Sequence, residues 1–497
     1  MTRNDATWTR RRFLRAAAIG VAGGLAVAVG VEEAVVARAL LGRGRPPAFP
    51  GAAPTDPRLH FWSRPDLAPH PIAILTPADR VADGYVFLTP GVDGGQADGL
   101  MIVDNRGEPV WIHPVSEPTI ANLRVQQYRG KPVLTWREGQ NVEGHGLGEC
   151  VVADGAYREI ARIRGANGQQ CDMHEFLISP EGTALVTAYA DVADASTGGR
   201  HVLEGIIQEI DIATGKLLFE WHSLGVVAVD ESYYKAADAS HPFDYFHINS
   251  IDVDLDGNLI VSARHTWTVY KLDRSSGAIL WRLGGKRSDF TIDPAAAFSW
   301  QHDARVHPGG RLSLFDDAYP PTPSRAIVLQ LDEVSKTVAL VQGYRHPTRI
   351  SSGTRGNVQL LPNGNAFVGW GGAPFASEFG PAGNLRFDLA LWPGDLSYRG
   401  FRCVWRGRPS DQPAVAIRRP SSGGTIVYAS WNGATDVQTW QILTGDTSTR
   451  LQVAASATRR GFETVIALPS VRRFVVARAL DGSGTVLGTS ALVAVPT

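Results

Sequence analysis

The chain has 497 residues and carries 48 Lys or Arg against 49 Asp or Glu, a formal net charge of -1. This balance argues against a nucleic-acid-binding protein, which normally carries an excess of basic residues. Hydrophobic residues make up 44% and charged residues 20%, which is typical of a globular protein, and the length allows two or three domains. The 53 Gly and 31 Pro favour many tight turns over long helices.

The first 39 residues have the pattern of a twin-arginine export signal. Arg10-Arg11-Arg12-Phe13-Leu14 precedes an apolar run of small residues, and Ala37-Arg38-Ala39 offers a cleavage site. We therefore expect residues 1–39 to be a signal peptide, with a retained N-terminal anchor as the alternative. The protein is then expected outside the cell or in the cell envelope. Residues 40–57, rich in Pro, Gly and Arg, are expected to form an extended linker.

The use of cysteine agrees with export. Cys150 and Cys171 could form a disulfide, which loop-closure entropy values at about 3 kcal/mol. Cys403 is left over and is expected to fill apolar space. The sequence contains no C-x-x-C pair and no Cys/His zinc spacing, which argues against a metal–thiolate site.

Short β-type runs recur from residue 58 to about 400. The clearest unit has runs over 247–254, 258–265, 268–273 and 278–281, with a turn at Asp256-Gly257, and predicts a four-stranded meander. Related units begin near 174, 302 and 357, and a weaker copy lies near 104–111. Five units with room for a sixth predict a β-propeller of five to seven blades over 58–400.

After residue 401 the pattern of β-type runs changes. Short runs such as 425–431 and 474–478 are separated by Asn-Gly and Asp-Gly turns. We expect residues 401–497 to form a small β-sandwich of fibronectin or immunoglobulin type without chemistry of its own. The whole chain is thus predicted to be all-β.

Three consecutive units place a histidine at the start of the first strand: His174, His247 and His302. Equivalent positions in a propeller converge on one mouth of the central channel. A hairpin centred on Asp256 also returns His265, with Arg264 beside it, to the end that carries His247. His302 likewise faces Asp316-Asp317. One such histidine is more often structural, but a set in register favours a functional site. A metal site is the lesser alternative, because no His pair has i, i+2 or i, i+4 spacing.

Several motifs resemble the bacterial arylsulfotransferase family over roughly residues 60–400. They are residues 246–251, 262–266, 281–285, 301–304, 356–359 and 364–371. The resemblance implies an exported six-bladed propeller that moves a sulfuryl group from a phenolic sulfate ester to another phenol. It implies no nucleotide or other cofactor and no metal, and partners that are small molecules rather than nucleic acids.

The resemblance also implies roles for individual residues. His247 and His302 match the family's blade-opening histidines, and Arg325 matches its catalytic arginine. Such groups suit a sulfate ester, because cations stabilise the departing phenolate and a neutral imidazole can attack sulfur. The candidate catalytic residues are therefore His247, His302, His265, Arg325 and His174. The candidate substrate-binding residues are Arg264, Arg355, Trp300 and Trp370, although blade packing explains either tryptophan equally well.

One departure from the family pattern bears on the mechanism. The family's nucleophilic histidine is expected in a later blade, but residues 351–357 contain none, and His346 is the nearest. Either another histidine is the nucleophile, or transfer is direct, or the activity has changed. Two other classes stay open. One is a binding propeller for a cell-surface glycan or partner, with the C-terminal domain touching the envelope. The other is a quinoprotein-like propeller, which Asp211–Gly215 and Trp221 resemble only in blade closure.

Overall fold

The computed structural model describes residues 58–92, 99–114, 119–142, 144–235, 241–419, 424–470 and 472–495. The predicted signal peptide, 1–39, and linker, 40–57, lie outside the described residues. Within the described part of the chain, no helix is long and apolar enough to cross a membrane. The helical segments there are short 3-10 turns, namely η1 (Ala195–Thr197), η2 (Val229–Glu231) and η3 (Pro294–Ala296). The prediction of an all-β chain is confirmed.

Six sheets follow one another through residues 73–403 of the described chain. The first contains β28 (Phe401–Cys403), β2 (Tyr85–Leu88), β4 (Leu100–Val103) and β5 (Pro109–His113). The second contains β6 (Thr119–Tyr128), β7 (Lys131–Val142), β8 (His145–Ala153) and β9 (Glu159–Ile163). The third contains β10 (Phe176–Ile178), β11 (Thr183–Asp194), β12 (Arg200–Asp211) and β13 (Leu217–His222).

The fourth sheet contains β14 (Ile248–Val253), β15 (Leu259–Ala263), β16 (Thr268–Leu272) and β17 (Ile279–Gly284). The fifth contains β19 (His302–His307), β20 (Arg311–Asp316), β21 (Arg325–Asp332), β22 (Thr337–Tyr344) and the parallel strand β18 (Thr291–Ile292). The sixth contains β23 (Asn357–Leu360), β24 (Ala366–Gly369), β25 (Phe375–Phe379), β26 (Leu385–Ala390) and β1 (Ala73–Thr76). A separate pair joins β3 (Gly91–Val92) to β27 (Asp395–Leu396).

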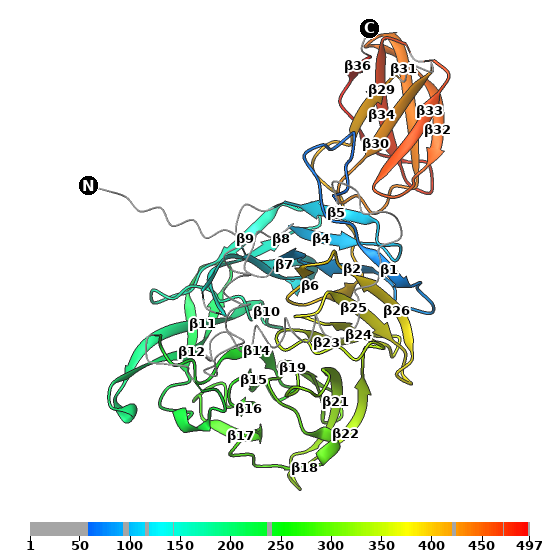
Figure 1. Cartoon of the computed structure of the whole chain (residues 1–497). Coiled ribbons are helices and arrows are strands. Elements are labelled where there is room, and N and C mark those ends of the chain that lie inside the picture. The colour runs from blue at the N-terminus through cyan, green and yellow to red at the C-terminus, as the bar shows by residue number, and fades with distance from the viewer. Residues whose placement is uncertain are drawn as a thin grey trace, which may run out of the picture.

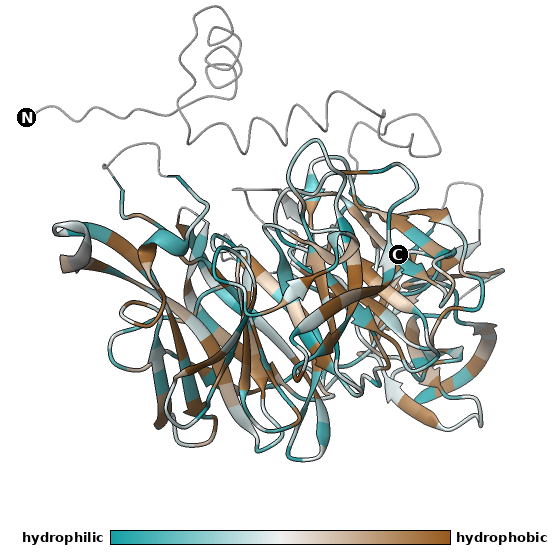
Figure 2. Cartoon of the chain, turned by 90° about the horizontal axis from the view of Figure 1, so that it is seen from below, coloured by the Kyte–Doolittle hydropathy of each residue, from teal (hydrophilic) through white to brown (hydrophobic). Residues whose placement is uncertain are grey.

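The six sheets form a closed ring. Consecutive sheets share hydrophobic clusters of buried residues, and the sixth sheet shares one with the first. The pairing of β28 with β2 joins the end of this region to its beginning, as Figure 1 shows. In Figure 2 the strands carry most of the hydrophobic colour and the connecting loops are mainly hydrophilic. Burial of apolar surface between neighbouring sheets therefore holds the ring together.

The meander predicted for residues 247–281 is confirmed. β14 to β17 pair in sequence order, and the Asp254 carbonyl accepts from Gly257 N–H at 2.9 Å in the first turn. Gly257 has φ +85°, a conformation that Gly adopts at little cost. A second glycine has a packing role, because a Cβ on Gly277 would lie 2.8 Å from Trp221 Cδ1. Trp221 Nε1 donates to the Gly277 carbonyl at 3.0 Å and so ties the third sheet to the fourth.

Asparagine side chains tie three of the innermost strands to the next sheet. Asn122, Asn249 and Asn357 each donate from Nδ2 to a backbone carbonyl of the following sheet, at 2.7, 2.7 and 2.8 Å. All three asparagines are at most 3% exposed. These bonds fix the starts of the inner strands relative to one another, which is where the predicted site residues lie.

The C-terminal residues form two further sheets. One contains β29 (Ala414–Arg418), β30 (Thr425–Ser430) and β33 (Glu463–Leu468). The other contains β32 (Arg450–Thr458), β31 (Thr439–Thr447), β34 (Phe474–Leu480), β35 (Val486–Thr489) and β36 (Val493–Ala494). The two sheets enclose a common core that includes Val427 and Trp440.

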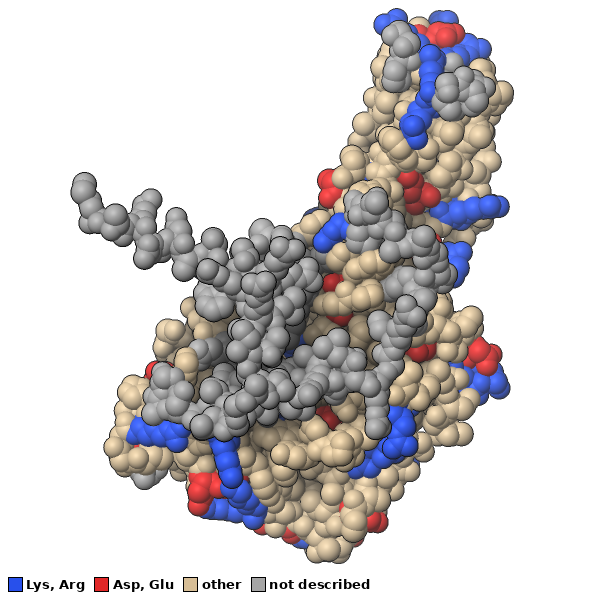
Figure 3. Space-filling model, in the orientation of Figure 1, with Lys and Arg blue, Asp and Glu red and all other residues tan. Residues whose placement is uncertain are grey.

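The C-terminal sheets project from the ring beside its first sheet (Figure 1). Asn432 exchanges two hydrogen bonds with the backbone of Ile112 in β5, at 2.7 and 2.9 Å. The domain boundary was expected between residues 400 and 401. Strand pairing places it after Cys403, because β28 completes the first sheet. Charged residues of both signs lie scattered over the face seen in Figure 3 and at the tip of the C-terminal sheets.

The cysteines are all free thiols, so the disulfide considered for Cys150 and Cys171 is not formed in this structure. Both are fully buried in the cluster between the second and third sheets. Cys171 Sγ lies 3.5 Å from the Ile163 carbonyl, and burial raises the pKa of the Cys150 thiol well above its ordinary value. Cys403 is half-buried beside the first two sheets.

Candidate active site

The structure brings the four predicted histidines together. His174, His247 and His302 stand at the start of β10, β14 and β19, and His265 follows β15. The ring of His247 lies 4.9 Å from that of His174 and 4.5 Å from that of His265, centroid to centroid. Arg264 N–H donates to the His247 carbonyl, and His265 N–H donates to the Phe246 carbonyl. A register shift between Ile248 and Ser250 moves the pairing by one residue from the predicted one, but His247 and His265 still lie at the same end of the hairpin. The four residues are 2–9% exposed, and His247 is the most exposed.

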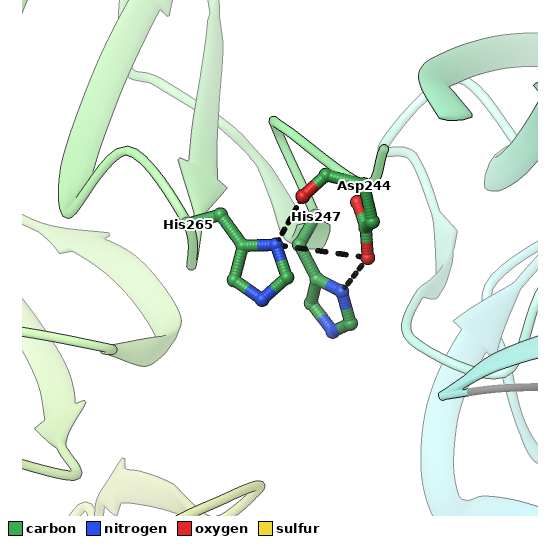
Figure 4. Close-up of side chains that lie close together, drawn as sticks. All are labelled: Asp244, His247 and His265. Atoms are coloured by element: carbon green, nitrogen blue, oxygen red, sulfur yellow. Dashed lines mark hydrogen bonds and ion pairs between the residues drawn. The ribbon is translucent and has the colours of Figure 1, made fainter. Parts of the chain in front are cut away.

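Every one of these imidazoles has Nδ1 on a hydrogen-bond acceptor. His174 Nδ1 lies 2.5 Å from Asp172 Oδ2, and His302 Nδ1 lies 2.6 Å from Asp317 Oδ2. His247 Nδ1 is bonded to Asp244 Oδ2, and His265 Nδ1 lies 2.5 Å from the Asp244 carbonyl oxygen (Figure 4). An acceptor at Nδ1 fixes the proton on that nitrogen and leaves a lone pair on Nε2.

Burial disfavours the protonated form of three of the four imidazoles, those of His174, His265 and His302. Burial lowers the pKa of His174, and it lowers the pKa of His265 and His302 well below the ordinary value. Arg264 lowers the pKa of His302 further. Burial opposes ionisation of Asp244, yet the adjacent imidazoles of His247 and His265 hold the pKa of its carboxyl well below the usual range. Neutral Nε2 atoms can act as bases or nucleophiles near neutral pH.

The backbone of the site is held in an uncommon conformation. His247, Trp300, Asp303 and Arg355 have φ values of 54°, 56°, 57° and 70°. Non-glycine residues rarely adopt this left-handed region, which costs on the order of 1 kcal/mol or more each. Such conformations persist where the surrounding fold enforces them, and they gather at functional sites. Here they aim residues at the start of the fourth, fifth and sixth sheets.

Arg264 is the arginine that lies against the histidines. Its guanidinium stands 4.6 Å from the Trp300 ring and donates to the Gly353 carbonyl at 2.9 Å. Arg355 joins the site through its backbone, whose N–H faces His302 Nε2 at 3.3 Å. Arg325 has other partners: Asp316 Oδ2 at 2.8 Å and the carbonyls of residues 295 and 297 at 3.1 and 2.6 Å. These contacts engage the Arg325 guanidinium and stabilise the fifth sheet.

The two predicted tryptophans have different surroundings. Trp300 stands 5.8 Å from His265 and 5.3 Å from Trp267, so it borders the site. Trp267 in turn stacks on Tyr233 at 3.8 Å. Trp370 is 0% exposed and donates to Ser377 at 2.9 Å, deep in the sixth sheet. His346 packs edge-on against Trp370 at 5.5 Å and so belongs to that core.

Sequence reasoning missed the residues that orient the histidines. Asp172 and Asp244 precede His174 and His247 by two and three positions, and a search for carboxylates at that spacing would have found them. Trp267 carried no signal of its own, because its place depends on the turn after β15. Asp317 was expected opposite His302, and its bond to that histidine confirms the pairing.

One cluster at the site has the composition of a metal site. Ligand atoms of Asp244, His247 and His265 lie within 4.8 Å of one another. The Nδ1 atoms of both histidines, however, already face oxygen atoms of Asp244 at hydrogen-bond distance. A metal bound at those atoms would displace both protons. The arrangement therefore fits an orienting hydrogen-bond network better than a metal centre.

A buried ion cluster lies at the residues next to the histidines. Glu175 contacts Arg124 at 2.8 Å, Arg399 at 3.3 Å, and also Arg305. Asp303 contacts Arg305 at 2.6 Å and Arg399 at 3.3 Å. Burial opposes ionisation of Glu175, but the three arginines lower its pKa to about 2. His174 directly precedes Glu175, and His302 directly precedes Asp303. The ion cluster therefore fixes the backbone next to both histidines.

Similarity to individual known proteins is low. No functionally curated protein matches the chain. Among solved structures, a protein of unknown function from Bacteroides caccae aligns over 64% of this chain and 98% of its own, with 14% identity and a TM-score of 0.39. Virginiamycin B lyase from Staphylococcus aureus aligns over 64% and 87%, with 10% identity and a TM-score of 0.32. An exo-beta-1,3-galactanase from Phanerochaete chrysosporium aligns over 83% and 94%, with 10% identity and a TM-score of 0.32. These scores are too low to support an inference about function.

A family model gives the stronger match. The model of Arylsulfotransferase (ASST) matches residues 124–391, which is more than half of the chain. The matched span contains all four site histidines and Arg264. This chain therefore belongs to the arylsulfotransferase (ASST) family.

Proposed function

We propose that the protein transfers a sulfuryl group from a phenolic sulfate ester to a phenolic or other hydroxyl acceptor without a nucleotide cofactor. The observation that carries the proposal is the set of imidazoles whose Nδ1 atoms are fixed by acceptors beside Arg264. Uncharged Nε2 atoms supply a nucleophile and a base, and the guanidinium supplies positive charge for the sulfuryl and phenolate oxygens. Trp300 and Trp267 border the site and supply apolar surface for the aryl ring.

His247 is the nucleophile in this proposal. It lies between His174 and His265, it is the most exposed of the four, and Asp244 fixes its Nδ1. Its Nε2 attacks sulfur, the sulfur–oxygen bond to the aryl group breaks, and the electron pair leaves with the phenolate oxygen. The product is a sulfohistidine, and Arg264 stabilises the charge that develops on the departing oxygen.

The second half of the transfer reaction returns the enzyme to its starting state. A neighbouring neutral imidazole, that of His174 or His265, takes the proton of the acceptor hydroxyl. The acceptor oxygen attacks sulfur, the nitrogen–sulfur bond breaks, and its electron pair returns to His247 Nε2. The proton then passes to the departed phenolate or to water. His302 has Asp317 on Nδ1 and the Arg355 N–H facing Nε2, so it positions the site.

The remaining sequence expectations belong to the same proposal. The six sheets are the blades of a six-bladed propeller, supported by their closed ring, and the strands β29 to β36 form the predicted fibronectin- or immunoglobulin-like sandwich, supported by two sheets around one core. Residues 1–39 direct export by the twin-arginine route to the envelope or the medium. The C-terminal sandwich contacts the cell envelope. Replacement of Arg10 and Arg11 by Lys is then expected to keep the protein in the cytoplasm.

The nucleophile is tested with 4-nitrophenyl sulfate as donor and phenol as acceptor. His247→Ala should lose about 10³-fold or more in kcat, and His302→Ala about 10- to 100-fold. His201→Ala is the matched control, because that histidine is 62% exposed and pairs with Asp191 on a hairpin. Its activity should equal that of the wild type. Quenching during turnover should trap one added SO₃ group on the peptide that contains His247. Trapping on another histidine would overturn the assignment, and a burst-free reaction without an adduct would indicate direct transfer.

A further inference from the structure

A buried tyrosine hydroxyl without a partner lies beside the site. Tyr398 directly precedes Arg399 and the inner strand β28, so it enters the ring as His174 does before β10. Its ring stands edge-on to the His174 ring at 5.7 Å. Tyr398 is 6% exposed, and its hydroxyl has no hydrogen-bond partner among the described residues.

Three other tyrosines that are buried or half-buried have hydrogen-bond partners for their hydroxyl groups. Tyr189 donates to the Ile248 carbonyl at 2.7 Å, Tyr157 to the Gly433 carbonyl at 2.7 Å, and Tyr245 to Ser223 Oγ at 2.8 Å. A buried hydroxyl that has lost water without gaining a partner destabilises the folded state. A phenylalanine at residue 398 would keep the same ring contacts without that cost. The hydroxyl is therefore unexplained by the fold alone.

The surroundings of Tyr398 suit an anionic ligand. Its backbone carbonyl accepts from Gly356 N–H at 3.1 Å, which places residue 398 against the Arg355–Gly356 turn. Arg399 stands 5.4 Å from its ring. Burial raises the pKa of Tyr398, so its phenol stays protonated and remains a donor. Arg399 is paired with Glu175 and Asp303, so the protonated phenol is itself the donor that this position offers, and a charged acceptor oxygen is its strongest partner.

We propose that the Tyr398 hydroxyl donates a hydrogen bond to a sulfuryl oxygen of the bound aryl sulfate, from the side of the site that carries His174. The inference rests on the proposed function, because it assigns a further substrate contact to the same site. Tyr398 and Arg264 then hold the sulfuryl oxygens from two directions while the sulfur faces the histidines. The unpaired hydroxyl is thus retained for the ligand at the expense of stability.

The test compares Tyr398→Phe with Tyr157→Phe in the full-length protein. Thermal unfolding, kcat/KM for 4-nitrophenyl sulfate, and the affinity for benzenesulfonate by calorimetry are measured for each. Benzenesulfonate has sulfonate oxygens but cannot transfer its sulfur group. Tyr398→Phe should keep or raise the Tm, lower kcat/KM about 10- to 100-fold, and weaken benzenesulfonate about tenfold. Tyr157→Phe removes a satisfied bond far from the histidines, so it should lower the Tm and leave the other two values unchanged.

The outcomes separate this inference from the proposed function. If the wild type is active and Tyr398→Phe has the same kcat/KM and the same affinity for benzenesulfonate, the role of Tyr398 is refuted. The proposed function is not affected by that result. A wild type without turnover would refute the proposed function, and the affinity measurement would still decide the contact. A clear fall in Tm for Tyr398→Phe would show that the hydroxyl has a structural partner, and this would also overturn the inference.

Discussion

The buried ion cluster allows a quantitative prediction about stability. Glu175→Gln keeps the shape and hydrogen-bonding capacity of the side chain but removes its charge. Arg305 and Arg399 would keep their contacts with the Asp303 carboxylate, whereas Arg124 would lose its carboxylate partner. Glu175 and Arg399 are 0% exposed, so water cannot replace the lost charge. Breaking a buried ion pair by removing one partner costs about 3–5 kcal/mol.

The pKa of Glu175 gives a second value for the loss of unfolding free energy. Its folded value of about 2 lies below the ordinary value of 4.5. At about 1.4 kcal/mol per pKa unit, the ionised group contributes about 3 kcal/mol to the free energy of unfolding. Because the folded pKa is lowered, this contribution is complete above the unfolded pKa and disappears as the pH falls toward 2. The two routes agree on the size of the effect.

Urea unfolding followed by tryptophan fluorescence measures the effect. At pH 7, Glu175→Gln should unfold with a free energy about 3–5 kcal/mol below that of the wild type. The difference in unfolding free energy between the wild type and Glu175→Gln should narrow as the pH falls from about 4.5 to the lowest accessible pH. Glu159→Gln is the control, since that half-exposed carboxylate pairs with Arg162 at the surface. Surface pairs contribute up to about 1 kcal/mol. Two results would contradict this role of Glu175. One is an equal loss of unfolding free energy in both variants, and the other is a loss in Glu175→Gln that does not change with pH.

Three further predictions concern activity. Because burial lowers the pKa of the two candidate bases, His174 and His265, the single-turnover rate of sulfuryl transfer to the acceptor should stay level from pH 8 to the ordinary histidine value of 6.5 and fall only below it. A fall that begins above pH 7 would contradict neutral buried imidazoles. Arg264→Lys should lose about 10- to 100-fold in kcat/KM because a guanidinium binds sulfuryl oxygens with two donors. Arg325→Lys should mainly lower the Tm, and the reverse result would return the catalytic role to Arg325. Trp267→Ala should raise KM more for a naphthyl sulfate than for 4-nitrophenyl sulfate, and an equal rise would exclude an aryl contact there.

The repeats and the register of the histidines could be predicted from the sequence. Turn residues such as Asp256-Gly257 fix where a hairpin reverses, and the spacing of His247 and His265 about that turn then places both at one end. The boundary at residue 400 was less predictable. A strand as short as Phe401–Cys403 has no pattern of its own, and only its pairing with β2 assigns it to the first sheet.

The side-chain partners of the site were harder to predict. Arg264 and Arg325 look alike in sequence, yet Asp316 and two carbonyls occupy one guanidinium while the other lies against Trp300. Trp300 and Trp370 differ in the same way. The partners come from other sheets, and one sequence without long-range contacts does not reveal them. The carboxylates at Asp172 and Asp244 were local enough to find, had their spacing from the histidines been considered.

The proposed reaction of this chain is the transfer of a sulfuryl group between hydroxyl groups. The most direct test incubates the purified protein with 4-nitrophenyl sulfate, with and without phenol, and follows both 4-nitrophenolate and phenyl sulfate by absorbance and mass spectrometry. Sulfuryl transfer requires release of 4-nitrophenolate that depends on phenol, with an equal amount of phenyl sulfate formed. Release without an acceptor, with free sulfate as the product, would identify a sulfatase. No turnover by the folded protein with several aryl sulfates would contradict the claim and favour a binding propeller.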